Sequence, residues 1–171
     1  MAAVSLFTFI NLFDRQVGTL DHLLTKGAEF CKAQGQPEAA FLDWRLVDDM
    51  NPFRFQAMVI CNFVRLWPAR AAGLPLPAEV PDSLDLAGWR AAVADARAYL
   101  AALKPEQFAG RDDIPLTVTI GNGMEPTLPS AQWLTVFANT NIYFHLSMAY
   151  AILRMKGVQI GKRDVFAGGG L

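Results

Sequence analysis

The sequence has 171 residues, of which 53% are hydrophobic and 18% charged, and its formal net charge is −1. This length suits a single domain, 1–171, with a sizeable core, and the near-neutral charge with scattered basic residues argues against a nucleic-acid partner. The apolar excess indicates either an unusually large core or a surface covered by a second copy of the chain, so we expect a homodimer.

A long first helix is predicted over residues 4–33. Its apolar residues recur at steps of three and four, which is typical of an amphipathic helix with one buried face. The residues of this stripe are Leu6, Ile10, Phe13, Val17, Leu20 and Leu24. Gly35 is expected to end the helix. A helix of about 30 residues is about 45 Å long, which favours a helical bundle over a compact mixed fold.

Two further helices are predicted over residues 52–72 and 84–103. Asn51 suits the cap of the earlier helix, and Asp82 or Ser83 suits the cap of the later one. The earlier helix is expected to bury Phe55, Val59, Phe63, Leu66 and Trp67. The later helix is expected to bury Leu86, Trp89, Val93, Ala96, Leu100 and Leu103.

A short β-hairpin is predicted before the last helix. Residues 114–120 alternate in character, Gly121–Asn122–Gly123 is a turn signal, and residues 124–128 can return as a second strand. Because an isolated hairpin is marginally stable, it is expected to pack on the helices or on a partner.

The last helix is predicted over residues 130–157 and carries no charge before Arg154. This run is long enough to span a bilayer, but it contains four polar side chains that are costly in lipid. They are Gln132, Asn139, Asn141 and His145. A buried helix is therefore favoured over a membrane span. The tail from about residue 165 is expected to be flexible.

The sequence also indicates a cytoplasmic protein. The apolar run within the first 16 residues has no basic segment before it, so we expect no signal peptide. Cys31 and Cys61 form no CxxC pair and no cluster with histidine, which argues against a zinc site built on cysteine. Lone cysteines of this kind are typically reduced and buried.

The candidate site is a polar pair in the apolar last helix. Asn141 and His145 are four residues apart, so they share one face of the helix, and we expect that face to lie in or near the core. A buried imidazole or amide needs hydrogen-bond partners. The candidate partners are Gln56, Asn62, Asn11, Asp14, Asp48 and Asp49.

Two interpretations of this polar pair stay open. It can line a ligand pocket between the helices, or it can be a satisfied polar network that fixes helix register. A metal site needs at least three nitrogen, sulfur or carboxylate ligands, and no second histidine is near His145 in the sequence. His22, the other histidine, follows Asp21 on the polar side of its helix and is expected to face solvent.

Two segments of the sequence resemble a known family. They are LVDDMNPFRFQ at residues 46–56 and FHLSMAYAILRMKGVQIGKRD at residues 144–164. Both are similar to a bacterial family of unknown function within the DinB-like (YfiT-like) proteins. The resemblance implies an all-α, up-down-down-up four-helix bundle with a short β-hairpin before the last helix, often dimeric.

The resemblance also carries an expectation about metal. Many DinB-like relatives hold a divalent metal with three histidines, one on the second helix and two on the fourth, and some are thiol-dependent transferases or isomerases. The fourth-helix pair corresponds here to Asn141 and His145, and the second-helix position falls near residues 59–61, where there is no histidine. Met58 replaces a glutamine frequent in the closer family. We therefore expect no bound metal and no cofactor.

Two functional hypotheses follow. In the first, a metal-free bundle binds a small molecule or acts through dimerisation, with His145, Asn141, Gln56 and Asp49 as candidate ligand-binding residues. In the alternative, the protein is a transferase or hydrolase with an altered site, either metal-dependent or with His145 as general base and Asn141 or Gln56 orienting the substrate.

Overall fold

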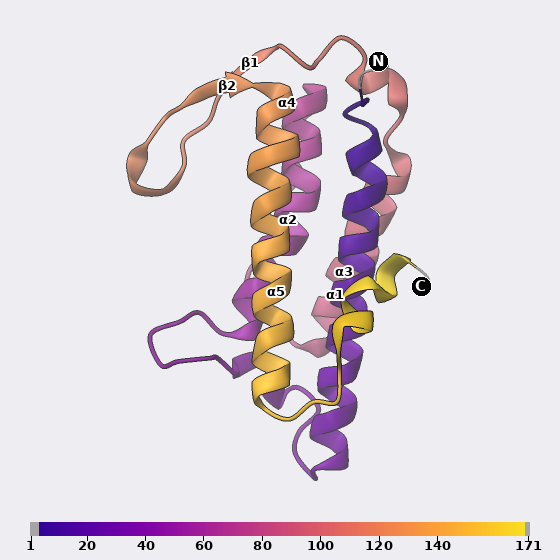
Figure 1. Cartoon of the computed structure of the whole chain (residues 1–171), viewed down its shortest axis with the longest axis vertical. Helices are drawn as coiled ribbons and strands as arrows, with labels where there is room; N and C mark the ends of the chain where they lie inside the picture. Colours follow the sequence, from indigo (N-terminus) through magenta and orange to yellow (C-terminus); the bar gives the residue numbers. More distant parts are fainter. Residues whose placement is uncertain (1–3, 170–171) are drawn as a thin grey trace.

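The computed structural model describes residues 4–169, and in it four long helices form an up-down-down-up bundle (Figure 1). The first three are α1 (Thr8–Ala33), α2 (Phe53–Ala72) and α3 (Leu86–Ala102). The fourth is a continuous rod made of α4 (Ser130–Gln132), a π-helical segment (Trp133–Ala138) and α5 (Asn139–Met155). The predicted fold class is confirmed.

Helix α1 matches its predicted pattern closely. All six residues of the predicted stripe are at most 3% exposed. The helix ends where expected, because Gly35 adopts the left-handed conformation with a φ of 67°. A residue with a side chain is strained in that conformation, so the sequence alone locates this end of the helix.

Helix α2 differs from its prediction in which face is buried. Phe55 and Phe63 are only partly buried, whereas Phe53, Ile60 and Val64 are fully enclosed. This helix contacts α1, α3 and the fourth helix, so nearly its whole circumference is covered. A helix covered by neighbours on several sides has no single apolar stripe, and the predicted face was therefore wrong in part.

The helix caps also differ from the predictions. The residue before α2 is Pro52, which provides no side-chain cap, and Asn51 is exposed. At α3 the cap is Asp85, whose carboxylate accepts a hydrogen bond of 2.7 Å from the Gly88 N–H. Neither Asp82 nor Ser83 has this role, because the helix begins later than expected.

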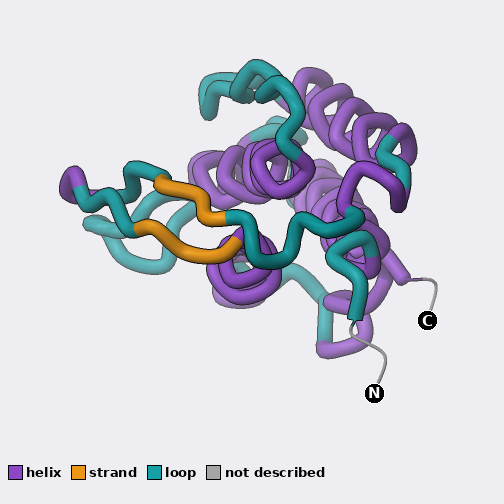
Figure 2. The backbone as a smooth tube through the Cα atoms, turned by 90° about the horizontal axis from the view of Figure 1, so that it is seen from above, coloured by secondary structure: helices purple, strands orange, loops and turns teal. Residues whose placement is uncertain are grey.

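The hairpin lies beside one end of the bundle and extends away from it (Figure 2). Strand β1 (Pro115–Thr117) pairs antiparallel with β2 (Thr127–Pro129), with Leu116 opposite Leu128. The turn contains Asn122 with a φ of 62°, as the turn signal in the sequence predicted. Trp133 anchors the hairpin to the bundle, since its indole N–H donates to the carbonyl of Leu116 at 2.8 Å.

The C-terminal segment Lys162–Gly169 forms a 3-10 helix that packs against α1. A Cβ atom added at Gly18 would lie 2.9 Å from the Cα of Gly168, so the two backbones touch where neither residue has a side chain. The expected flexibility of the tail from about residue 165 stays a prediction. Among residues 4–169, no helix has both the length and the apolar character needed to cross a membrane.

Gly27 provides a test of the packing between α1 and the connection to α2. A Cβ at Gly27 would lie 2.6 Å from the ring of Phe41, which is fully buried and packs edge-on against Phe53 with ring centroids 5.0 Å apart. Gly27→Leu should reduce the free energy of unfolding by about 1–3 kcal/mol through overpacking, although leucine favours the helix. Urea denaturation measures the loss.

Gly121→Ala is the matched control, because an added Cβ there meets no atom within 4 Å. It should change stability by less than about 0.5 kcal/mol. Equal stability of Gly27→Leu and the wild type would show that Phe41 does not occupy this position in solution.

Candidate functional site

The candidate site is centred on a hydrogen bond between α2 and α5. The Nδ1 atom of His145 lies 2.7 Å from Oε1 of Gln56, which is 3% exposed. Gln56 is held from the other side, since its Nε2 donates to the carbonyls of Asn51 at 3.0 Å and Pro52 at 3.3 Å. Of the predicted partners of His145, Gln56 is the one that contacts it.

This network determines which ring nitrogen of His145 carries the proton. Both partners of the Gln56 Nε2 are carbonyl oxygens, so the amide nitrogen must face them and the amide oxygen must face the imidazole. Nδ1 of His145 therefore donates to Gln56. In the neutral ring, Nε2 then has a lone pair, and it accepts no hydrogen bond from the part of the chain between residues 4 and 169.

Burial keeps this imidazole neutral. Desolvation lowers the pKa of His145 from 6.5 to about 4. The rings of Phe55 and Phe144 flank the imidazole, with centroids 6.1 Å and 5.2 Å away, and no carboxylate between residues 4 and 169 pairs with it. The site thus presents a neutral hydrogen-bond acceptor in apolar surroundings.

Asn141 lies one helical turn from His145, as predicted, but the two side chains do not bond to each other. Asn141 is partly buried, and its Nδ2 donates to the carbonyl of Phe137 at 2.8 Å within the same helix. The fully buried face of α5 lies beside this pair and includes Ile142 and Leu146. The polar pair is therefore at the edge of the core rather than inside it.

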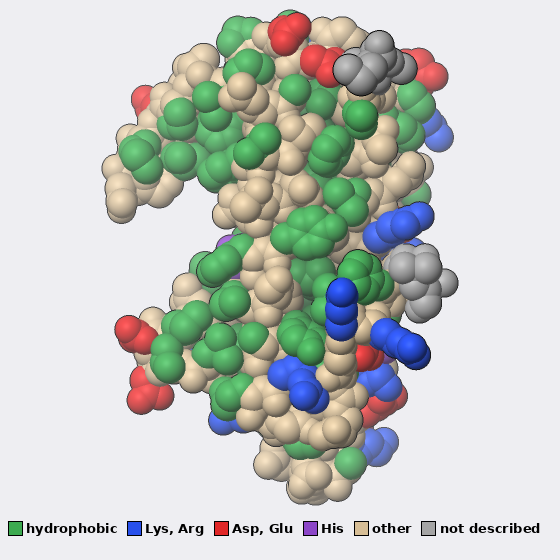
Figure 3. Space-filling view, in the orientation of Figure 1, with side chains coloured by type: hydrophobic (Ala, Val, Ile, Leu, Met, Phe, Trp, Pro, Cys, Tyr) green, Lys and Arg blue, Asp and Glu red, His purple; other side chains and the backbone are tan. Residues whose placement is uncertain are grey.

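A groove of about 390 Å³ begins at Asn141 and runs toward the hairpin, between α2, the fourth helix and residues 118–121. Figure 3 shows this side of the molecule hollowed between the hairpin and the segment that precedes α2. The groove's aromatic walls are Phe63, Trp67 and Phe137. Its polar residues are Asn62, Arg70, Glu79, Thr119 and Asn141.

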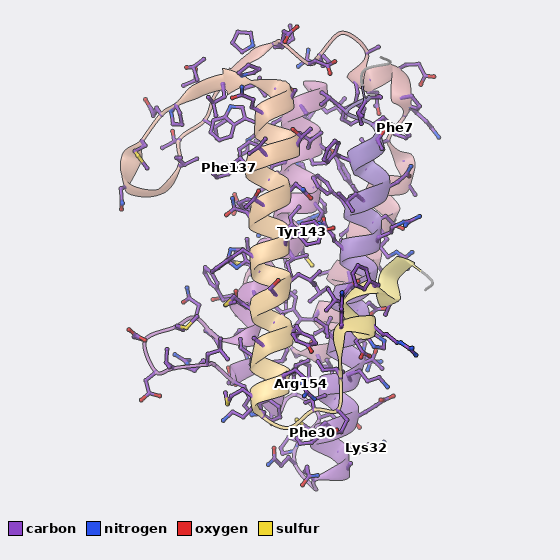
Figure 4. The ribbon with its side chains drawn as sticks, viewed as in Figure 1. Phe7, Phe30, Lys32, Phe137, Tyr143 and Arg154 are labelled. Atoms are coloured by element: carbon purple, nitrogen blue, oxygen red, sulfur yellow. The ribbon has the colours of Figure 1, made fainter. Side chains whose placement is uncertain are left out.

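The groove wall is built on a tight aromatic cluster. Trp67 stacks on Trp133 with ring centroids 5.0 Å apart, and Phe137 meets both indoles edge-on. Figure 4 shows Phe137 on the fourth helix beside the hairpin. These residues of the fourth helix lie in its π-helical segment, a distortion found frequently at functional sites. Spacings of four in the sequence, Phe63 to Trp67 and Trp133 to Phe137, were the available signal for the cluster.

Asp49 is the candidate residue that the structure does not bring to His145. Its side chain is exposed in the segment before α2, and it forms no hydrogen bond or ion pair with the described residues. His22 also differs from expectation. Its Nε2 lies 2.7 Å from Oδ1 of Asp164, so it is a partly buried contact of the C-terminal segment rather than a solvent-facing residue.

The residues at this site do not fit the three-histidine metal centre of the DinB-like relatives. His145 offers one nitrogen, and the Nδ2 of Asn141 donates to Phe137, so Asn141 could offer only its amide oxygen, which suits Mg²⁺ or Ca²⁺ better than a transition metal. Cys61, at the second-helix position, is fully buried, and desolvation raises its pKa to about 12, so the thiol keeps its proton. Within residues 4–169, no three side chains of His, Cys, Asp or Glu are grouped to hold a metal ion.

The lowered pKa of His145 predicts a pH-dependent stability with a defined sign. The unfolded state takes up a proton near pH 6.5 and the folded state only near pH 4. The unfolded state therefore binds more protons between these values, and stability should fall as the pH drops through this window. Urea denaturation at several pH values should show a shallower fall in His145→Gln than in the wild type.

A second variant tests whether the pKa of His145 depends on its contact with Gln56. In Gln56→Glu a carboxylate would face Nδ1 of His145, so the pKa of His145 should rise by about 1–3 pH units in an NMR titration. Gln159→Glu is the control, because Gln159 is exposed and, among the described residues, its side chain bonds the carbonyl of Gly157 alone. An unchanged pKa in Gln56→Glu would show that the two side chains do not meet.

Comparisons with known proteins identify the family of this chain. The sequence matches a family described as a domain of unknown function, DUF1993, over residues 7–166. The crystal structure of a DinB family member protein from Shewanella denitrificans has a TM-score of 0.82 and 26% sequence identity, covering 92% of this chain and 88% of that one. No curated protein matches the sequence. Because the family match spans the four long helices and the His145–Gln56 pair, the chain belongs to the DUF1993 family of DinB-like proteins of unknown function.

Proposed function

We propose that this protein binds a small, largely apolar molecule in the groove between α2, the fourth helix and the hairpin, without a metal ion. The observation that carries the proposal is the fixed tautomer of His145, whose Nε2 accepts a hydrogen bond from the ligand. Asn141 lines the groove, and His145 lies four residues, or about 6 Å along the helix, beyond it, so a ligand in the groove reaches the imidazole by extending one turn past Asn141.

The chemistry of the groove defines the class of ligand. Its aromatic wall favours a flat, apolar body that stacks on Trp67 or Phe137. The neutral acceptor of His145, one turn beyond the Asn141 end of the groove, favours a hydroxyl, thiol or amide N–H donor on the ligand. Arg70 and Glu79 both lie on the groove wall and have opposite charges, so the groove selects no strongly charged ligand.

The same imidazole argues for binding over general-base catalysis. A general base works best when its pKa is near the operating pH, and burial lowers the pKa of His145 to about 4. At neutral pH such an imidazole is a weak base. The alternative of a histidine-based transferase or hydrolase therefore needs a ligand that raises this pKa on binding.

Binding can be tested with 2-naphthol and 2-methoxynaphthalene, which share the same rings while only 2-naphthol has an O–H donor. Titration followed by NMR of the indole signals of Trp67, which lines the groove, should show both compounds bound there. The wild type should prefer 2-naphthol by about fivefold, because one neutral hydrogen bond is worth about 1 kcal/mol. His145→Leu should abolish the preference while keeping affinity for the rings.

The control variant is His22→Leu, which removes the other histidine and should leave the preference intact. Binding of neither compound, or equal affinity of both for the wild type, would contradict the proposal. Elemental analysis tests the metal-free part separately, since about one equivalent of a transition metal per chain would overturn it.

We also propose that the protein is a cytoplasmic homodimer. The fourth helix supports this, because its outward face has no charged residue before Arg154 and exposes three large apolar side chains. They are Val136, Tyr143 and Phe144. A two-fold pairing of this helix with its copy would cover them.

Sedimentation at micromolar concentration should give a dimer. Phe144→Glu, which adds a charge to this outward face, should shift the protein to a monomer without unfolding it. The control, Ala91→Glu, adds the same charge at an exposed position of α3 and should leave the protein a dimer. A monomeric wild type would rule the homodimer out.

A further inference from the structure

A second cavity lies on the opposite side of α5 from the groove. Its volume is about 280 Å³, and its walls come from α1, α5 and the C-terminal segment Lys162–Gly169. Tyr143, which lines it, is about 200° around the helix from Asn141. Figure 4 shows Tyr143 on the side of α5 that faces α1. The two cavities therefore share a helix but open on different faces of the molecule.

The C-terminal segment closes this cavity and is held in place at several points. Val165 and Phe166 line the cavity from this segment. The hydroxyl of Thr19 donates to the carbonyl of Val165 at 3.0 Å and accepts from the Gly168 N–H at 3.3 Å. One turn further along α1, the His22–Asp164 contact fixes the start of the segment.

Polar groups of α1 give the cavity a distinct chemistry. Gln16 lines it and is 3% exposed. Its Nε2 donates to Oδ1 of Asn139 at 3.2 Å, but its buried Oε1 has no hydrogen-bond partner among residues 4–169. Buried acceptors almost always accept a hydrogen bond, so the lack of a partner for this oxygen indicates that a donor is missing.

The charge of the lining residues is a second constraint on the ligand that this cavity can bind. Arg15 is the one charged residue among those that line the cavity, and it forms no ion pair with any described residue. The remaining walls are mostly apolar and include Leu12, Leu146 and Phe166. An apolar chamber with one cation at its edge is complementary to a small organic acid.

We propose that this cavity binds an apolar organic acid that also carries a hydroxyl or amide N–H donor. The carboxylate pairs with the guanidinium of Arg15, the donor bonds Oε1 of Gln16, and the chain or ring packs on Leu12, Leu146 and Phe166. The volume lies just below the range of roughly 300–1,000 Å³ for drug-sized ligands, so the acid is short.

The test uses three probes with the same carbon chain: 3-hydroxyoctanoate, octanoate and octanol. Calorimetric titration of the full chain should rank their affinities in that order. Arg15→Gln should weaken 3-hydroxyoctanoate by about tenfold and leave octanol unchanged, because it removes a charge-assisted hydrogen bond. Gln16→Met should abolish the preference for 3-hydroxyoctanoate over octanoate.

Two control variants keep the result specific to this cavity. Arg163→Gln removes an exposed positive charge from the C-terminal segment outside the cavity, and it should bind all three probes as the wild type does. His145→Leu should also behave as the wild type, so failure of the groove proposal does not affect this one. If Gln16→Met does not fold, Leu12→Trp replaces it, and filling the cavity should abolish binding of all three probes.

Three outcomes would overturn the proposal. They are the absence of saturable binding of 3-hydroxyoctanoate, equal affinity of wild type and Arg15→Gln for it, and undiminished binding by Leu12→Trp.

Discussion

The antiparallel packing of α2 against the fourth helix is the contact on which the rest of the structure depends. At the hairpin end, Trp67 of α2 stacks on Trp133, and the indole N–H of Trp133 donates a hydrogen bond to the hairpin. Further along the two helices, His145 bonds Gln56. One interface thus fixes the hairpin, forms the groove wall and orients the imidazole.

Burial at this interface also decides what the imidazole can do. The partner of His145 is an uncharged glutamine amide, which does not stabilise the protonated imidazole as a carboxylate would. Desolvation alone therefore lowers the pKa of His145. The result is a neutral acceptor with a fixed tautomer. The pair resembles the supporting arrangement of a histidine ligand in a metal site, in which one ring nitrogen is anchored so that the other is presented.

Several elements of the fold could be predicted because the sequence patterns that indicate them are local. The buried stripe of α1, the glycine that ends it and the hairpin turn each depend on residues close together in the chain. The His145–Gln56 pair was among the predicted contacts because apolar helices contain few alternative partners for an imidazole. The buried face of α2 was misassigned, since a helix covered on all sides has no clear periodicity.

Other features depend on residues too distant in sequence for such reasoning. His22 bonds Asp164 across 142 positions, and nothing near either residue indicates the other. The groove is assembled from α2, the fourth helix and the hairpin, so no single segment shows it. The cavity under the C-terminal segment is likewise assembled from distant parts of the chain. That the side-chain oxygen of Gln16 lacks a hydrogen-bond partner can be recognised only from the packed structure.

The position of Asn141 has an evolutionary consequence. Asparagine and histidine codons differ at a single base, and residues four apart on a helix can bind one metal ion together when both are histidine. Asn141 lies one turn from His145, whose anchored ring already presents Nε2. One nucleotide substitution would therefore supply two of the three imidazoles that the family resemblance assigns to metal-binding DinB-like relatives, and the third would need a separate change on α2, where Cys61 is buried.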